Sequence, residues 1–260
     1  GGRGMKVART EGDLEIAMST AQSEARAAFG KGDVYIEKYL EKPRHIEIQI
    51  LGDGQGNAIH LGERDCSLQR RHQKLVEEAP APNITEELRQ QIRAAGVTLA
   101  KGFGYENAGT VEFIVDQDAQ AFYFLEMNTR IQVEHPVTEM ITGTDLVEWQ
   151  LQVASGNPLP MTQEQILANV KGCAIEARIY AENPLKDFLP STGTLTHMMT
   201  PVNRAIVEDG VRVDSGIRSG DKVSTFYDPM IAKLIAYGEN RHDAVLKLQR
   251  SLRDFQVAGL

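Results

Sequence analysis

The sequence predicts an α+β fold, in which helices and antiparallel strand pairs are both present. Residues 13–29 and 85–99 carry apolar side chains at helical spacing. Residues 45–61 and 109–128 each contain two strand-like runs joined by a short polar turn, which is the pattern of an antiparallel hairpin. From residue 171 onward, short β-like runs separated by turn residues predominate. We therefore expect a mixed fold that becomes richer in strands toward its end.

Helix and strand signals place the elements in order. Apolar residues at helical spacing predict helices over residues 13–29, 85–99 and 145–154, a short helix after 162, and a last helix from about 243. Asp13, Thr85 and Thr162 are the expected N-caps. Apolar and alternating runs predict strands over residues 34–37, 45–51, 58–61, 109–115, 122–128, 173–180, 205–213 and 230–237. The change of pattern predicts a domain boundary near residue 170.

The composition is that of a folded protein and argues against several functional classes. The chain has 260 residues, of which 42% are hydrophobic and 25% are charged. Its formal net charge of −8 argues against general binding to nucleic acid or membrane surfaces, because both need a basic face. Cys66 and Cys173 form neither a disulfide framework nor a zinc pattern, which fits a reducing compartment. No apolar run approaches the roughly 20 residues needed to cross a bilayer.

The stretch EMNTRIQVEHP, residues 126–136, carries a polar side chain at every second position over most of its length. In an extended chain, alternate side chains point to the same face. The polar residues in this row are Glu126, Asn128, Arg130, Gln132 and Glu134. We expect the segment to be extended through at least Gln132, because a helix would scatter these side chains.

Glu112 and Glu126 each lie in an apolar run, where a carboxylate is costly unless it is paired or bound to a cation. A hairpin that pivots at Ala119 would place the two directly opposite one another, on one face. With Asn128 they would supply hard oxygen ligands for Mg²⁺ or Mn²⁺, and phosphates would complete the shell. The alternative is a pair of edge-strand glutamates facing water. The three residues together favour the metal site.

Arg130 and Glu134 continue the row with a different chemistry. The guanidinium of Arg130 can hold a small planar oxyanion through two parallel hydrogen bonds. Glu134 lies near that charge and is a candidate general base. The alternative is a solvated strand face. It is weakened because the row starts at the metal pair and ends at the turn His135-Pro136.

Residues 66–74 form the densest cationic segment of an otherwise acidic chain. A polyanion such as a nucleotide triphosphate would explain them. Ion pairing would explain them equally well, with the candidate partners Glu63, Asp65, Glu77 and Glu78. Residues 37–40 precede a proline and resemble a connector, either a simple strap or one whose backbone pairs with a purine edge. Gly1-Gly2-Arg3-Gly4 resembles the end of a glycine loop that covers phosphates.

Several long motifs resemble the biotin carboxylase module of biotin-dependent carboxylases, an ATP-grasp enzyme. They are EKYL (37–40), ERDCS (63–67), QRRHQK (69–74), EEAPAP (77–82) and EMNTRIQVEHP (126–136). The resemblance covers the whole chain and implies a partial ATP-grasp fold followed by a β-rich C-terminal subdomain. Residues 1–40 would belong to the lid with a truncated glycine loop, 41–170 to the core with the metal and bicarbonate site, and 171–260 to a truncated C-terminal domain.

The resemblance also implies roles for individual residues. Residues implied to bind ATP are Gly1, Gly2, Glu37, Lys38, Tyr39, Leu40, His45, Gln69 and His72. Those implied to hold two Mg²⁺ or Mn²⁺ ions are Glu112, Glu126 and Asn128. Those implied to bind bicarbonate are Arg130, Gln132 and the backbone amide of Val133. Lys74 would reach the transferred phosphate and bicarbonate, and Glu134 would be the base.

The implied reaction is the ATP-dependent carboxylation of biotin. Deprotonated bicarbonate would attack the γ-phosphate of ATP to give carboxyphosphate, which breaks down to carbon dioxide and phosphate. The phosphate would then take the proton of the biotin ureido nitrogen, and Arg130 with Arg178 would stabilise the enolate-like biotin. The implied partners are a biotin carrier domain and a carboxyltransferase subunit, with an oligomer for the full-length protein.

Within the family, residues 146–151, 174–184 and 227–234 most resemble the α subunits of methylcrotonoyl-CoA carboxylases, with acetyl-CoA and propionyl-CoA carboxylases as alternatives. That resemblance implies the mitochondrial matrix for a eukaryotic source and the cytoplasm for a bacterial one. The chain lacks the ATP-contacting lysines of the family's N-terminal domain and a Met-Lys-Met biotin attachment motif. We expect it to be part of a longer protein, with little or no turnover by itself.

Two other functions fit parts of the sequence. Another ATP-grasp ligase, such as a carboxyaminoimidazole or carbamoyl-phosphate enzyme, would share the metal carboxylates. It gives no reason for the order of residues 130–134 or for Arg178. A non-catalytic scaffold for subunit assembly gives no reason for the intact set of carboxylates and Arg130.

Overall fold

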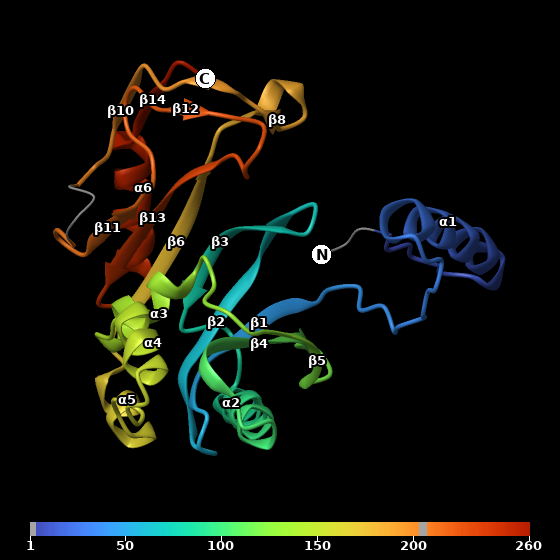
Figure 1. Ribbon diagram of the computed structural model, residues 1–260, viewed down its shortest axis with the longest axis horizontal. Helices are drawn as coiled ribbons and strands as arrows, with labels where there is room; N and C mark the ends of the chain where they lie inside the picture. The colour runs from blue at the N-terminus through green and yellow to red at the C-terminus, as the bar shows by residue number, and fades with distance from the viewer. Residues whose placement is uncertain (1–3, 203–206) are drawn as a thin grey trace.

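The computed structural model describes residues 4–202 and 207–260, which combine helices with one large antiparallel sheet and confirm the α+β prediction (Figure 1). Gly1, Gly2 and part of the strand expected over 205–213 lie outside the described residues. The helices are α1 (Glu11–Phe29), α2 (Glu86–Gly102), α3 (His135–Thr142), α4 (Leu146–Ala154), α5 (Gln163–Asn169), α6 (Arg241–Asp254) and a short 3-10 helix, η1 (Pro184–Lys186). In the described part of the chain, no helix is both long and apolar enough to cross a membrane.

Eight strands form the large sheet, in the order β11-β13-β6-β3-β2-β1-β4-β5, and every neighbouring pair is antiparallel. They are β1 (Arg44–Asp53), β2 (Ala58–Arg70), β3 (Gln73–Ala79), β4 (Glu106–Asp116), β5 (Ala121–Asn128), β6 (Cys173–Tyr180), β11 (Val211–Asp214) and β13 (Met230–Gly238). The pairing of β3 with β6 joins the strands before residue 170 to those after it in one ladder. The division into three domains stays a prediction.

Six short strands form separate two-stranded pairs near the end of the chain. They are β7 (Glu182–Asn183), β8 (Leu189–Pro190), β9 (Gly193–Thr194), β10 (His197–Met199), β12 (Lys222–Val223) and β14 (Gln256–Ala258). These pairs account for the expected increase in β structure toward the end of the chain.

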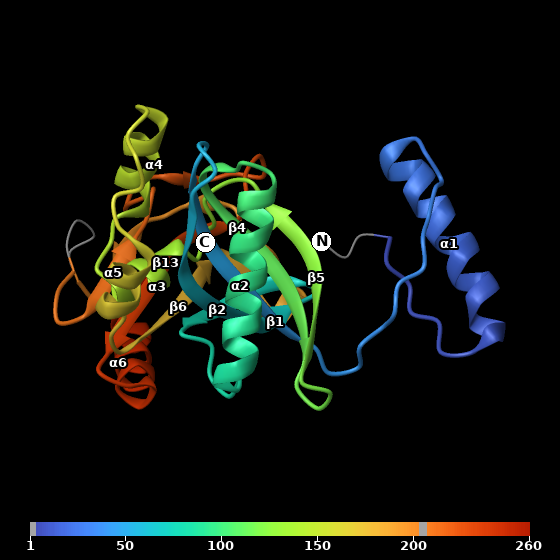
Figure 2. The ribbon, with the colours of Figure 1, turned by 90° about the horizontal axis from the view of Figure 1, so that it is seen from below.

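Helices cover both faces of the large sheet (Figure 2). Ile46 of β1 and Ala236 of β13 lie on one face, because an unbroken series of directly paired residues connects them. Ile46 packs in a cluster with α2, and Ala236 packs in a cluster with α6. On the other face, Ala174 of β6 packs with Val137 and Ile141 of α3, and α4 and α5 continue this second layer. The central strands are therefore buried on both sides.

The register of the β4–β5 hairpin confirms one prediction and corrects its geometry. Glu112 and Glu126 are directly paired, as expected from the sequence. Closer to the turn the register shifts by one residue, so that Phe113 pairs with Phe124 and Leu125 is an extra residue in β5. Such a bulge bends its strand and re-aims the neighbouring side chain. The assumed pivot at Ala119 therefore holds only for the part of the hairpin that carries the glutamates.

Helix α1 stands apart from the sheet and buries none of its residues (Figure 1). Residues 30–43 connect it to β1, and the strand expected over 34–37 is absent from this described segment because no strand pairs with it. The expected N-cap Asp13 is wrong. Thr10 is the N-cap, and Asp13 completes the capping box by accepting a hydrogen bond from the Thr10 backbone N–H. Thr85 and Thr162 cap α2 and α5 as predicted.

We expect Ile48→Ala to lower the free energy of unfolding by about 2–5 kcal/mol, because it removes buried methyl groups and leaves a cavity between β1 and α2. Ile48 is 0% exposed, whereas Ile16 on α1 is 71% exposed. Ile16→Ala is the matched control and should change stability by no more than about 0.5 kcal/mol. Urea denaturation of both variants measures the difference, and equal losses would contradict the packing described here.

Candidate active site

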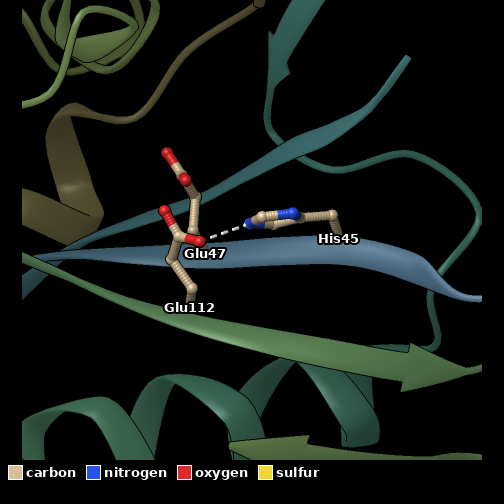
Figure 3. A group of neighbouring side chains, drawn as sticks. All are labelled: His45, Glu47 and Glu112. Carbon is tan, nitrogen blue, oxygen red and sulfur yellow. Dashed lines mark ion pairs between the residues drawn. The ribbon is translucent and has the colours of Figure 1, made fainter. Parts of the chain in front are cut away.

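The polar cluster lies on the face of the sheet that α3 covers, and strands from both halves of the ladder contribute to it. Glu47 on β1 pairs directly with Glu112 on β4, which pairs with Glu126 on β5. Directly paired residues point to the same side of a sheet. Figure 3 shows Glu47 and Glu112 on that common side, with His45 beside them. The sheet register therefore gathers carboxylates that are far apart in the sequence.

Lys74, in the middle of the cluster, contacts three carboxylates. Its Nζ lies 2.7 Å from Glu47 Oε2, 2.9 Å from Glu112 Oε1 and 2.7 Å from Glu134 Oε1. Burial alone would lower the pKa of Lys74, but Glu47 and the other neighbouring anions raise it above its usual value. Lys74 is therefore a fixed cation in the middle of the carboxylate cluster.

Glu134, the residue just before α3, is 0% exposed and bridges two cations. Its Oε1 accepts from Lys74, and its Oε2 accepts from Arg178 Nη2 at 3.0 Å. The buried thiol of Cys66 donates to the same Oε1 at 3.9 Å. A carboxylate held between two cations, in a site shielded from bulk water, is placed to take a proton from a small acid bound beside it.

Glu112, Glu126 and Asn128 lie together at one end of the β4–β5 hairpin, as the sequence predicts. Asn128 Nδ2 donates to Glu112 Oε1 at 3.1 Å and lies 3.4 Å from Glu126 Oε1. Burial raises the pKa of Glu112, but contacts with His45 and Lys74 outweigh it and lower that pKa to about 2. The two carboxylates, with Glu112 ionised at neutral pH, suit Mg²⁺. Asn128 turns its amide nitrogen toward them and its oxygen toward Arg130, so its oxygen would complete the donor set once the amide turns over.

Arg130 and Gln132 join this group through side-chain hydrogen bonds rather than through strand pairing. Arg130 Nη2 donates to Asn128 Oδ1 at 3.2 Å, and Nη1 donates to Gln132 Oε1 at 3.1 Å. Gln132 Nε2 in turn donates to Glu112 Oε1 at 3.3 Å. However, β5 ends at Asn128 and the chain bends at Arg130, so the expected extension through Gln132 is wrong. The side chains converge because the chain turns back over the sheet toward α3.

His45 and Gln69 flank the metal set, on β1 and β2. Gln69 Nε2 lies 3.0 Å from His45 Nδ1, within hydrogen-bond distance. His45 Nε2 lies 2.8 Å from Glu112 Oε2, although the geometry is that of an ion pair rather than a directed hydrogen bond (Figure 3). His45 and Glu47 also lie close enough to Glu112 for one oxygen or nitrogen of each to share an ion.

Glu47 and Arg64 also belong to the cluster, although local sequence patterns did not predict them. Both are fully buried, and Arg64 Nε donates to Glu47 Oε1 at 2.5 Å. Burial would raise the pKa of Glu47, but Arg64 and Lys74 lower it to about 2. The signal was the alternation of Glu47 with the isoleucines of β1, which also fits a solvated strand face. Only the layer formed by α3, α4 and α5 shows that this second face is buried.

The ion-pair alternative for the cationic segment 66–74 named the wrong candidate partners. Arg70 pairs with Glu182, Arg71 with Asp187, and Lys74 with the cluster carboxylates. The four carboxylates expected as partners pair elsewhere, namely Glu63 with Arg89 and Arg93, Asp65 with Arg44, Glu77 with Arg178, and Glu78 with Arg241. Proximity in sequence did not predict the ion-pair partners, because the pairing of the strands, rather than the turn, determines which side chains are neighbours.

Several predicted nucleotide-binding residues lie outside the cluster. His72 is exposed in the turn between β2 and β3. Residues 37–40 are in the connector after α1, where Lys38 Nζ lies over the ring of Tyr123, 5.7 Å from its centroid. Among the described residues, no hydrogen bond or ion pair joins these positions to Glu112. Val133 contributes its carbonyl oxygen to Lys233 Nζ at 2.9 Å.

Two family models match the chain. One, described as the ATP-binding domain of the carbamoyl-phosphate synthase L chain, matches residues 1–162. The other, described as the biotin carboxylase C-terminal domain, matches residues 176–260. The chain belongs to the ATP-grasp biotin carboxylase family. The resemblance predicted from the motifs is confirmed.

This biotin carboxylase chain is 57% identical over 260 residues to the mitochondrial methylcrotonoyl-CoA carboxylase subunit α of Glycine max, matching all of the chain and 35% of the relative. It matches a biotin carboxylase–β,γ-ATP complex from Campylobacter jejuni with a TM-score of 0.91 and 48% identity, over 100% of this chain and 56% of that one. The chain thus spans about a third of the plant relative and just over half of the bacterial structure.

A second solved structure carries ligands relevant to the cluster. It is the biotin carboxylase domain of Hydrogenobacter thermophilus 2-oxoglutarate carboxylase, in complex with MgADP, ADP and bicarbonate. The TM-score is 0.92 and the identity is 47%, over 100% of this chain and 55% of that one. These ligands belong to that protein, and their chemistry is of the kind that the donor set described above could accept.

Proposed function

We propose that this biotin carboxylase chain contributes the site at which bicarbonate, activated by ATP, carboxylates biotin. The observation that carries the proposal is Glu134, a buried carboxylate held between Lys74 and Arg178. Bicarbonate must lose its proton before it attacks a phosphate, and a base beside fixed cations both removes that proton and stabilises the dianion formed.

The other residues of the cluster take complementary roles in this proposal. Arg130 and Gln132 orient bicarbonate beside Glu134, with the backbone amide of Val133 as a further donor. Lys74 neutralises the charge that develops on the transferred phosphate and on bicarbonate. Arg178 places a cation where negative charge develops on the biotin ureido group. Carboxyphosphate, formed when bicarbonate attacks the γ-phosphate, is the intermediate that the closed site must protect from water.

Glu112, Glu126 and Asn128 are the proposed ligands of the divalent cations, which we propose to be two Mg²⁺ or Mn²⁺ ions. Bound there, the ions would neutralise the negative charge of the ATP phosphates. Residues proposed to contact the nucleotide are Gly1, Gly2, Glu37, Lys38, Tyr39, Leu40, His45, Gln69 and His72. Of these, His45 and Gln69 are the ones already in contact with the metal set or with each other.

The finer assignment is to a methylcrotonoyl-CoA carboxylase. It is supported by the identity to the plant α subunit. The proposed partners are a biotin carrier domain and a carboxyltransferase subunit, in an oligomer. The mitochondrial relatives favour the matrix as the compartment if the source is eukaryotic, and related bacterial enzymes favour the cytoplasm if it is bacterial.

The experiment that tests this function uses the full-length protein and compares Glu126→Ala with Asp118→Ala. Glu126→Ala removes a proposed metal ligand and should weaken Mg-ATP binding by at least about tenfold. Asp118 lies exposed in the turn of the same hairpin, and its variant should bind like the wild type. Isothermal titration with Mg-ATP measures both. Equal binding by the two variants would refute the metal site and would suit a scaffold protein.

Release of ADP then separates biotin carboxylation from the chemistry of other ATP-grasp ligases. In the full-length protein, release should require bicarbonate and increase when biotin is added. ADP release that ignores biotin would indicate another carboxylate ligase. The C-terminal family match and the position of Arg178 on β6, facing Glu134, favour the biotin reaction.

A further inference from the structure

Two glutamates that the proposed reaction does not use face each other across the β3–β6 seam. Glu77 of β3 and Glu176 of β6 are directly paired, and both are 0% exposed. Directly paired side chains in an antiparallel sheet lie about 4.5–5.5 Å apart at Cβ. Two carboxylates are thus held side by side in the interior, where each ionised group is costly without a partner.

Only one of the four carboxylate oxygens has a hydrogen-bond partner among the described residues. Glu77 Oε1 accepts from Arg178 Nε at 2.7 Å. Glu77 Oε2 and both oxygens of Glu176 have none. An ionised Glu176 would leave a buried charge with no donor at all. A protonated Glu176, in contrast, has a hydroxyl that can donate to its neighbour.

Among the described residues no second cation bonds the pair directly, although the charge of Lys233 partly offsets the raised pKa of Glu176. The titratable groups that face it are Glu47 on β1, Cys66 on β2, Arg178 on β6, Lys233 on β13 and Glu134 before α3. Arg178 is shared between Glu77 and Glu134. Lys233 Nζ bonds the carbonyl of Val133 and lies 3.3 Å from Asp214. Burial raises the pKa of Glu77 to about 7, and burial beside Glu77 raises the pKa of Glu176 well above its usual value.

We propose that Glu77 and Glu176 share one proton at neutral pH, and that the resulting single negative charge makes Glu77 the positioning residue for Arg178. The shared proton is inferred from the direct pairing of the two buried carboxyls and from the lack, among the described residues, of hydrogen-bond donors to three of their four oxygens. The effect on catalysis rests on the proposed function, because it acts through Arg178. Glu77 holds Nε of the guanidinium, which leaves Nη2 directed at Glu134.

The shared proton protects this arrangement. Glu176 and Arg178 lie two residues apart on β6, so their side chains point to the same face of the sheet. A second negative charge at Glu176 would attract the guanidinium away from Glu134. High pH should therefore displace Arg178 from the base before any active-site lysine loses its charge.

The first experiment measures the proton without any activity, on the full-length protein. A buried carboxyl with a raised pKa disfavours folding increasingly as pH rises from the unfolded value of 4.5. Glu176→Gln keeps the shape of the neutral form and removes that penalty. The denaturation midpoint of the variant should therefore rise relative to wild type as pH increases from about 5 to 8. For the exposed control Glu86→Gln, the difference in denaturation midpoint from wild type should not change with pH.

Infrared difference spectroscopy gives a second, direct measure at neutral pH. Wild type minus Glu176→Gln should contain the carbonyl band of a protonated carboxyl, whereas wild type minus Glu77→Gln should contain mainly a carboxylate band, because Glu77 carries the charge that pairs with Arg178. Wild type minus Glu86→Gln should contain only carboxylate bands. The shared proton would be overturned if the stability difference between wild type and Glu176→Gln did not change with pH and their difference spectrum contained only carboxylate bands. This outcome does not depend on enzymatic activity.

The second experiment tests positioning. Glu77→Gln should lower kcat/KM for biotin by about tenfold to a hundredfold, since a charge-assisted hydrogen bond contributes about 1.5–3 kcal/mol, while the KM for Mg-ATP stays unchanged. Glu176→Gln should retain activity and move the alkaline limb of the pH profile to higher pH. Unchanged biotin kinetics in Glu77→Gln would overturn positioning. If wild type shows no biotin-dependent activity, the proposed function fails, and the stability and infrared results still decide the proton.

Discussion

Replacing Arg64 with methionine should lower the free energy of unfolding by about 3–5 kcal/mol, the largest loss of stability expected from a single substitution in the cluster. Arg64 is 0% exposed, and its guanidinium donates to Glu47, Gln49, Thr138 and Thr110. Methionine fills similar space but leaves Glu47 as a buried anion with Lys74 as its remaining cation. The penalty arises mainly because that buried charge loses one of its two cations, rather than from lost packing.

Two further variants isolate the cause. Arg71→Met removes an arginine whose side chain is 66% exposed and whose partner Asp187 is also exposed, so it should change stability by no more than about 1 kcal/mol. Adding Glu47→Gln to Arg64→Met removes the stranded charge and should recover part of the loss. Denaturant titration gives all three values. A loss in Arg64→Met no larger than that in Arg71→Met would show that the buried network contributes little.

Replacing Glu134 with glutamine should lower kcat by about 10²–10⁴-fold, because an amide has no basic oxygen that can accept the bicarbonate proton. The variant preserves the shape of the side chain, but its single carbonyl oxygen can accept from only one of Lys74 and Arg178, which bond different oxygens of Glu134. Binding of Mg-ATP should be little changed, since the proposed metal ligands are untouched. Bicarbonate-dependent ADP release in the full-length protein measures the rate.

Glu148→Gln is the control for that loss, because Glu148 is exposed on α4 and remote from the cluster. It should retain the wild-type rate. If Glu134→Gln also turned over at the wild-type rate, Glu134 would be a structural anchor for Lys74 and another group would have to be the base.

The sequence predicted the metal set because its evidence is local. Glu112 and Glu126 lie on two strands of one hairpin, so a symmetric turn was enough to oppose them. The bulge at Leu125 escaped prediction, since a symmetric turn implies an unbroken register. Residues beyond β5 converge through a bend at Arg130, which alternation alone does not describe.

Longer-range features were beyond the reach of local patterns. Glu47 and Arg64 look like the solvent face of a hairpin until a second helical layer covers them. Lys74 was assigned to the site by family resemblance, whereas its three carboxylate partners come from β1, β4 and the turn before α3. The pairing of Glu77 with Glu176 required the neighbourhood of β3 and β6, which are about 100 residues apart in sequence.

The contacts between β3 and β6 also join the two segments matched by the family models, residues 1–162 and 176–260. The backbone ladder between β3 and β6, the bonds of Arg178 to Glu77 and Glu134, and the bidentate pair of Arg241 with Glu78 all cross it. Separating β3 from β6 would expose an unpaired strand edge on each side, and several ionised groups would lose their partners at once. We therefore expect the described sheet to unfold as one cooperative unit, and a segment taken from a relative should fit only if it preserves the complementary charges of the seam.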